Sequence, residues 1–344
     1  MENNTWQIFG HDWAVNLLKT HVTSDKLRHA YLLVGPQGVG RRTLALRFAQ
    51  ALNCESPPKA GEFCGVCRTC RQLDKRAHPD LDLLVPEEGH KDILIDQVRT
   101  LQHHLALAPY MAPYRIALLL DFQRATTQAM NALLKTLEEP ADKVVLLLTA
   151  DALENLLPTI VSRCEVIRLR PAPLTNAQSF LQSKFDIATE QARLFTHLTS
   201  GRVGAAIQLI ENPDMLSSRD AHIKEFLSLM PAPRYERFKL AKTLSRPYDK
   251  AREKAGEVIP LWLSFWRDVF VRSSGADLPL VNVDLEAQVD QMAARITPRA
   301  ARELVIAHET ALQHLDAYAN VRLLLETLMI RWPQIPLPPL VENP

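Results

Sequence analysis

The stretch Val34-Gly-Pro-Gln-Gly-Val-Gly-Arg-Arg-Thr-Leu44 decides the fold of this chain. Its glycines fit the motif G-x-x-x-x-G-K-[ST], in which backbone N–H groups cradle phosphates between a strand and a helix. The residues that carry the chemistry differ, because Arg41 stands at the lysine position and Arg42 at the position of the hydroxyl that binds Mg²⁺. A cation cannot be a Mg²⁺ ligand, and Thr43 lies about 100° further round the helix. The stretch therefore predicts the framework of a nucleotide site without its chemistry.

Apolar runs on both sides of this loop predict a parallel sheet. Four runs have the length and composition of buried strands, at residues 31–34, 116–120, 144–148 and 166–169. One helical pattern precedes them, at residues 12–18, and others lie between them, at residues 43–52 and 127–137. Buried strands that alternate with helices are typical of a mostly parallel sheet covered on both faces, so the expected fold class is α/β.

Prolines mark the predicted domain boundaries. The last strand run ends at Pro171-Ala-Pro173, so we expect an α/β domain over residues 1–171. Residues 172–213 are then expected to form a compact helical unit, and residues 214–344 a larger helical domain. Breaks between the helices of this last domain are expected near Pro231, Pro247, Pro260 and residues 273–279.

The composition argues against several classes of protein. The net charge is +1, from 40 basic and 39 acidic residues among 344, so no global basic field recruits nucleic acid. No apolar run reaches the roughly 18 residues that span a bilayer. The start, Met1-Glu-Asn-Asn-Thr-Trp6, has neither the basic flank nor the apolar stretch of a signal peptide. We therefore expect a cytoplasmic protein with no membrane partner.

Four of the five cysteines gather in a short module, residues 54–70, directly after the helix that follows the loop. Cys54, Cys64, Cys67 and Cys70 have the spacing C-x9-C-x2-C-x2-C. This spacing lets four thiolates surround one tetrahedral Zn²⁺ and leaves no open position for water, so the site would be structural. Two alternatives remain open, namely four unrelated buried thiols or a redox C-x-x-C pair.

A second acidic motif would complete a nucleotide site. An ATPase of this class needs an Asp that orients Mg²⁺ and a following Glu that polarises water, both at the end of a strand. Here the apolar run ends in Asp121-Phe122, and a phenyl ring cannot accept a proton; an Asp at this position can also simply cap a turn. We expect no hydrolysis and consider ATP binding doubtful at this degenerate site, which consists of Gly35, Gly38, Gly40, Arg41, Arg42, Thr43 and Asp121.

Two longer strings point to a family. Asn131-Ala-Leu-Leu-Lys-Thr-Leu-Glu-Glu-Pro140 and Leu157-Pro-Thr-Ile-Val-Ser-Arg-Cys164 resemble the bacterial clamp-loader family within the AAA+ proteins. The resemblance covers nearly all of residues 6–332. It implies a RecA-like AAA+ domain with an inserted zinc module, a small helical lid, and an all-α collar that assembles with other subunits in a ring.

The same resemblance implies a role for Ser162-Arg163-Cys164. In the family this motif carries an arginine that projects into the ATP site of a neighbouring subunit. Arg163, preceded by Ser162, would then be a catalytic arginine finger acting in trans, and the alternative is an ordinary surface ion pair. The arginine that the family places in the lid corresponds here to Gly204, with Arg202, two residues earlier, as the alternative. The family's first sensor falls among residues 149–151.

The resemblance also implies a function in DNA replication. The chain would be a stator of the DNA polymerase III holoenzyme, a DNA-directed DNA polymerase, and would help to load the sliding clamp on primed DNA. Its partners would be the γ/τ and δ subunits, the sliding clamp, and primer-template DNA through the complex. Two rival hypotheses remain, a catalytically active γ/τ-like ATPase in which Arg41 replaces the lysine, and a zinc-dependent DNA-binding adaptor. Turnover by the isolated chain would support the first, and DNA affinity without partners the second.

Overall fold

The computed structural model describes residues 6–24, 26–87, 89–317 and 319–337. The chain divides into two compact units. The first consists of Met1–Pro173 and Arg202–Ala205, and the second of Leu174–Gly201 and Ala206–Pro344. The division into three domains stays a prediction, and its outermost residues, 1–5 and 338–344, lie outside the described part of the chain.

A five-stranded parallel sheet forms the centre of the first unit. Its order is β2-β3-β4-β1-β5, and every pairing between neighbours is parallel. The prediction of a RecA-like α/β fold is confirmed, since the Gly-rich loop follows β1 and Asp121 follows the end of β3. The strands are β1 Ala30–Val34, β2 Leu81–Leu84, β3 Arg115–Leu119, β4 Val144–Ala150 and β5 Glu165–Arg168.

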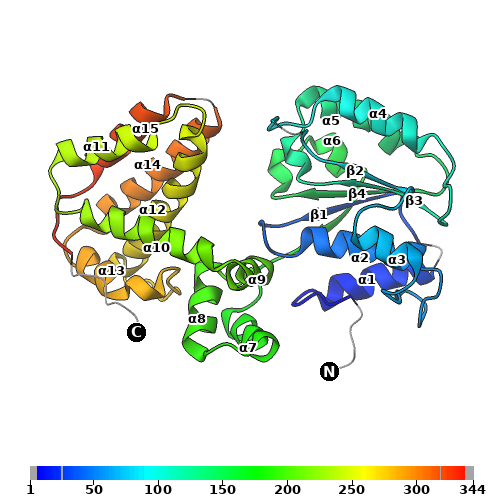
Figure 1. The fold of residues 1–344 in the computed structure, drawn as a ribbon, viewed down its shortest axis with the longest axis horizontal. Helices are drawn as coiled ribbons and strands as arrows, with labels where there is room; N and C mark the ends of the chain where they lie inside the picture. Colours follow the sequence, from blue (N-terminus) through cyan, green and yellow to red (C-terminus); the bar gives the residue numbers. More distant parts are fainter. Residues whose placement is uncertain (1–5, 25, 88, 318, 338–344) are drawn as a thin grey trace. The chain divides into compact units, whose positions relative to one another are not determined.

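Helices cover both faces of this sheet (Figure 1). Successive side chains of a strand point to opposite faces. Tyr31 and Leu33 of β1 therefore pack in the cluster with α1, α2 and α3, while Leu32 and Val34 pack in the cluster with α4, α5 and α6. The elements on the first face are α1 Asp12–Thr23, α2 Arg41–Asn53 and α3 Arg68–Asp74. Those on the second are α4 Ile95–Leu105, α5 Thr127–Glu138 and α6 Pro158–Val161, with the 3₁₀ turns η1 Phe122–Arg124 and η2 Leu153–Asn155.

Strand β2 was not among the predicted strands. It is four residues long and lies at the edge of the sheet, next to β3 only. Leu81 and Leu84 are buried, whereas Leu83 is 38% exposed and Asp82 interrupts the apolar run. A short edge strand with a charge inside it lacks the continuous apolar pattern that identifies the buried strands.

The second unit contains helices and no strand among its described residues, which confirms the predicted all-α C-terminal part. Its core contains the aromatic side chains of Phe226, Trp262, Phe265, Trp266 and Trp332. None of the described helices is long and apolar enough to cross a membrane. The helices are α7 Leu174–Phe185, α8 Thr189–Leu198, α9 Val203–Glu211, of which residues 203–205 belong to the first unit, α10 Pro213–Ser228, α11 Arg234–Leu244, α12 Ala251–Ser273, α13 Glu286–Ala293, α14 Pro298–Asp316 and α15 Val321–Arg331, with the 3₁₀ turn η3 Val283–Leu285.

The predicted break near Pro260 is wrong. Helix α12 continues through this proline for its full length, Ala251–Ser273. An internal proline removes one backbone hydrogen bond and crowds the preceding turn, which favours a break. Here Pro260 lies on the exposed side, while Ile259, Trp262 and Trp266 are buried on the other. Burial of this apolar stripe outweighs the local cost of the proline.

Candidate functional site

The Gly-rich loop connects β1 to α2 and is packed closely on both sides. A Cβ added at Gly35 would lie 2.3 Å from the backbone oxygen of Leu169, so only glycine fits there. Gly38 has a φ of +82°, and a Cβ on it would lie 2.6 Å from the Cβ of Ala205. His11, the residue before α1, supports the loop, with its Nε2 3.1 Å from the backbone oxygen of Val39. The glycines are thus explained by the shape of the loop alone.

Arg41 and Asp121 form an ion pair with each other. The NH2 of Arg41, the first residue of α2, lies 2.8 Å from Oδ1 of Asp121. The side chain of Arg41 is only 8% exposed. Asp121 has a φ of +50°, a conformation that is uncommon for residues other than glycine, and its backbone N–H donates to Oγ1 of Thr149 at 2.8 Å. Of the residues 149–151, Thr149 is therefore the one whose side chain contacts Asp121, while the backbone oxygen of Ala150 accepts from the N–H of Gly35 at 3.1 Å.

This ion pair changes what the site can do chemically. In a working site the lysine points at phosphate and the aspartate at Mg²⁺. Here the cation of Arg41 offsets the charge of the carboxylate that would attract Mg²⁺. NH2 of Arg41 makes this contact, while its NH1 is buried without a hydrogen-bond partner among the described residues. Phe122 is fully buried in the core on the α4, α5 and α6 face of the sheet, whereas Arg42 and Thr43 are exposed. Of the residues predicted for the nucleotide site, Arg41 and Asp121 are therefore the two whose side chains pair.

Gly204 belongs to the first unit and packs on the Gly-rich loop. A Cβ added at Gly204 would lie 2.7 Å from the backbone oxygen of Gly38, so no larger side chain fits without movement. Arg202, two residues earlier, donates from NH1 to the backbone oxygen of Gln37 at 3.2 Å. Burial lowers the pKa of the Arg202 guanidinium. The lid arginine of the family thus has no counterpart at Gly204, and Arg202 contacts a loop carbonyl.

Arg163 lies two residues before β5, outside the Gly-rich loop. Its side chain is 34% exposed, and its NH2 lies 2.7 Å from Oε1 of Glu138. Its NH1 donates to the backbone oxygen of Thr159 at 2.9 Å and approaches the hydroxyl of Ser162 at 3.4 Å. The hydroxyl of Ser162 in turn donates to the same Thr159 oxygen at 3.1 Å. Arg163 and Ser162 therefore form a small surface cluster that does not include Arg41 or Asp121.

The four clustered cysteines converge as their spacing predicts. All four sulfur atoms, of Cys54, Cys64, Cys67 and Cys70, lie within 4.8 Å of one another. Backbone N–H groups point at three of them, from Cys64 to Cys54 Sγ at 3.3 Å, from Cys67 to Cys64 Sγ at 3.2 Å, and from Cys70 to Cys67 Sγ at 3.4 Å. Burial raises the pKa of the Cys64 thiol, but hydrogen bonds from the backbone N–H groups of Cys67 and Val66 and with the side chains of Cys54 and Cys67 together lower this pKa to about 6.

This sulfur cluster fits a metal ion. Four sulfur donors with N–H support are the donor set of a closed tetrahedral Zn²⁺ shell, and no further side chain is needed to complete it. The ligands come from the end of α2, the segment after it, and the start of α3. A metal bound there would fasten these elements together.

Glu138 is the residue of this region that the sequence reasoning did not single out. It stood inside the family string that ends at Pro140, but its contact with Arg163 joins residues 25 positions apart. Thr149 was one of three candidates, and only the register of β4 shows which side chain reaches Asp121. Neither contact has a sequence signal of its own, since each depends on the packing of two elements.

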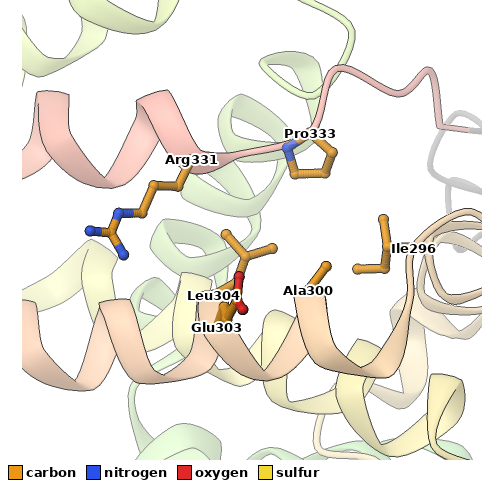
Figure 2. Close-up of a pocket in the computed structure, with 6 residues that line it drawn as sticks. All are labelled: Ile296, Ala300, Glu303, Leu304, Arg331 and Pro333. Atoms are coloured by element: carbon orange, nitrogen blue, oxygen red, sulfur yellow. The ribbon is translucent and has the colours of Figure 1, made fainter.

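One pocket of about 400 Å³ lies in the second unit (Figure 2). Its floor is apolar, from Ile296, Ala300 and Leu304, and Pro333 closes one side. Glu303 and Arg331 also line it. None of the predicted site residues is among them, so this pocket is separate from the degenerate nucleotide site.

Comparison with known proteins identifies the family. A model described as "DNA polymerase III, delta subunit" matches residues 10–173, and one described as "DNA polymerase III, delta subunit, C terminal" matches residues 215–334. The chain is 27% identical over 316 residues to DNA polymerase III subunit delta′ of Bacillus subtilis, covering 92% of this chain and 94% of that protein. It is 45% identical over 136 residues to subunit delta′ of Pseudomonas aeruginosa, which is 40% of this chain and 41% of the relative.

A similarity over about half of the chain links it to the gamma/tau subunits. It is 30% identical over 176 residues to DNA polymerase III subunit gamma/tau of Mycobacterium tuberculosis, covering 51% of this chain and 30% of that protein. Relatives named delta′ match over a larger share of their own length, and the two family models together match most of the chain. The chain therefore belongs to the DNA polymerase III delta-subunit family of clamp-loader proteins.

Proposed function

We propose that this chain acts as a delta′-type stator that supplies Arg163 as an arginine finger to the ATP site of a neighbouring γ/τ-type ATPase subunit. It would assemble with γ/τ and δ subunits in the cytoplasm and help to load the sliding clamp on primer-template DNA during replication. Its own nucleotide site would hydrolyse nothing, because the Arg41–Asp121 ion pair takes the place of the lysine–phosphate and aspartate–Mg²⁺ contacts. The similarity to delta′ subunits supports this proposal.

The topology of the sheet carries the proposal. Arg41 follows β1 and Asp121 follows β3, so the degenerate site lies at the carboxyl edge of the parallel sheet. Arg163 precedes β5, which places it at the opposite, amino edge. Strands of four or five residues separate these edges by roughly 15 Å, at about 3.3 Å per residue. Arg163 is too far from its own chain's loop to act there, and a partner must therefore provide any phosphate that it contacts.

A guanidinium suits this role for physical reasons. In phosphoryl transfer, negative charge develops on the γ-phosphoryl oxygens, and a planar, permanently charged fork stabilises it. The side chain of Arg163 is partly exposed and is therefore available to a second chain. The Cys54, Cys64, Cys67 and Cys70 cluster would hold a structural Zn²⁺ that keeps the module rigid, with no part in the reaction.

Replacement of Arg163 by alanine in the reconstituted complex tests the proposal. We expect the DNA-stimulated ATPase rate of the partner subunits to fall by roughly tenfold or more, since removed arginine fingers cost up to about 10³–10⁵ in other systems. The matched control is Arg170→Ala, which removes an exposed arginine from the segment after β5. An unchanged rate with Arg163→Ala, in complexes of normal composition, would exclude the finger role.

A further inference from the structure

Glu138 makes the one ion pair that Arg163 has among the described residues. We propose that Glu138 is a positioning residue, which orients the guanidinium of Arg163 for the phosphate of a neighbouring subunit. This inference rests on the proposed finger role of Arg163. It adds a residue that acts through Arg163 and touches no nucleotide itself.

Glu138 lies at a position where a negative charge is unfavourable. It is the last residue of α5, and the negative end of a helix dipole disfavours a carboxylate there. Glu139, the next residue, is also acidic and exposed, yet its side chain has no hydrogen bond or ion pair in the described part of the chain. Only Glu138 is compensated, by the guanidinium of Arg163 at 2.7 Å. The carboxylate therefore has a specific partner.

Buried residues fix the backbone on both sides of the Glu138–Arg163 ion pair. Leu137, next to Glu138, is 2% exposed, and Ile160, at the centre of α6, is fully buried. The backbone of Arg163 is held to α6 by its N–H, which donates to the oxygen of Ile160 at 3.1 Å. The Glu138 carboxylate therefore lies at the fixed end of α5, and the Arg163 guanidinium lies at the fixed end of α6.

The contacts of the guanidinium fix its orientation and leave donors unused. NH1 donates to the backbone oxygen of Thr159 and NH2 to Glu138, so acceptors on two different helices hold the plane of the group. Nε of Arg163 has no hydrogen-bond partner within the described residues. An arginine has five N–H donors, and those left over can reach phosphoryl oxygens. Ordering the side chain before the neighbour binds lowers the entropy cost of reaching the transition state.

The competing possibility is that Glu138 masks the finger. A half-exposed ion pair is weak, because water screens it, so a nucleotide phosphate with several charges is not excluded by one carboxylate. Masking predicts a faster reaction when the carboxylate is removed, whereas positioning predicts a slower one. The two ideas therefore differ in the sign of a single measured rate.

The experiment compares Glu138→Ala, Glu138→Gln and Glu139→Ala in the complete reconstituted complex. We expect Glu138→Ala to lower kcat for ATP hydrolysis by the partner subunits about tenfold, with KM for ATP unchanged, because the loss is in orientation and not in nucleotide binding. Glu138→Gln keeps an oxygen that accepts the Arg163 hydrogen bond and should recover most of kcat. Glu139→Ala should match the wild type. Added to Arg163→Ala, Glu138→Ala should cause no further loss.

Several outcomes would overturn this proposal. An unchanged or faster kcat with Glu138→Ala contradicts positioning, as does a Glu138→Gln variant that is as slow as Glu138→Ala. A full additional loss in the double variant would show that Glu138 acts independently of Arg163. Failure of the finger role itself is recognised separately, because Arg163→Ala alone would then leave the rate unchanged. Equal yield and composition of all complexes shows that assembly is intact.

Discussion

Arg41 shows what one side chain does to a phosphate-binding loop. A lysine at this position has a compact ammonium that reaches phosphate, whereas the longer, forked guanidinium lies against Asp121. The pair is nearly buried on the arginine side, and the guanidinium offsets the negative charge that would attract Mg²⁺. The loop keeps its glycines because Gly35 and Gly38 are required by close backbone contacts, which remain when no nucleotide is involved.

His308 gives a prediction about pH at the same scale. Its ring is fully buried beside Trp262, Trp266 and Trp332, with Nδ1 2.7 Å from the backbone oxygen of Leu304. The Nε1–H of Trp332 donates to Nε2 at 3.3 Å, an arrangement that suits the neutral imidazole. Burial lowers the pKa of His308 from 6.5 to about 4, while its hydrogen bond to Leu304 opposes this shift only in part.

The sign of the pH effect follows from this shift. The unfolded chain takes up a proton below about pH 6.5, whereas folded His308 does so only near pH 4. Its contribution to stability is therefore full above pH 6.5 and is lost as the pH falls towards 4, by about 3 kcal/mol. Urea unfolding followed by tryptophan fluorescence should show this loss for the wild type and a smaller one for His308→Phe. Parallel pH profiles for the two proteins would contradict the prediction.

Individual residues also show the limits of sequence reasoning. The spacing of the cysteines predicted which four side chains converge, because a C-x2-C step is short enough to fix the geometry locally. The Arg41–Asp121 contact could not be predicted in this way, since it joins positions 80 residues apart and depends on the order of the strands. The sequence showed that both residues were unsuited to catalysis, but it did not show that they bind each other.

At the scale of elements, the pattern of apolar residues predicted the buried strands and failed where packing decides. β1, β3, β4 and β5 lie where the apolar runs placed them, within a residue or two. The edge strand β2 has only two buried side chains and carried no clear signal. Helix α12 continues through Pro260 because the side of the helix opposite the proline is part of an aromatic core. The helix-breaking tendency of a proline, which is a local property, does not include the stabilisation from this burial.

The cysteine module gives a prediction at this scale. The purified protein should carry about one equivalent of Zn²⁺, and Cys67→Ser should lower both the metal content and the melting temperature, because a structural metal contributes to folding. Metal analysis and thermal unfolding with and without a chelator measure these effects. Cys164→Ala is the control, since Cys164 lies outside the cluster and should leave the metal in place. A metal-free protein of unchanged stability would remove the zinc assignment.

At the scale of the whole molecule, the first unit carries the degenerate nucleotide site and the Arg163 cluster at opposite edges of its sheet. The carboxyl edge of the sheet carries the Gly-rich loop with the Arg41–Asp121 ion pair, and the amino edge carries Arg163 with Glu138. The helical second unit has its own aromatic core and would provide the collar. This arrangement fits a subunit that supports a reaction in a partner and performs none of its own.

ATP turnover, measured for the purified chain alone and for the partner subunits with and without it, tests this account most directly. We expect no turnover by the chain alone, because Arg42 cannot bind Mg²⁺ and Phe122 cannot act on water. Added to the partner subunits and primed DNA, the same chain should raise their rate. Measurable ATP hydrolysis by the chain alone, or partner subunits that turn over equally fast without it, would contradict the account.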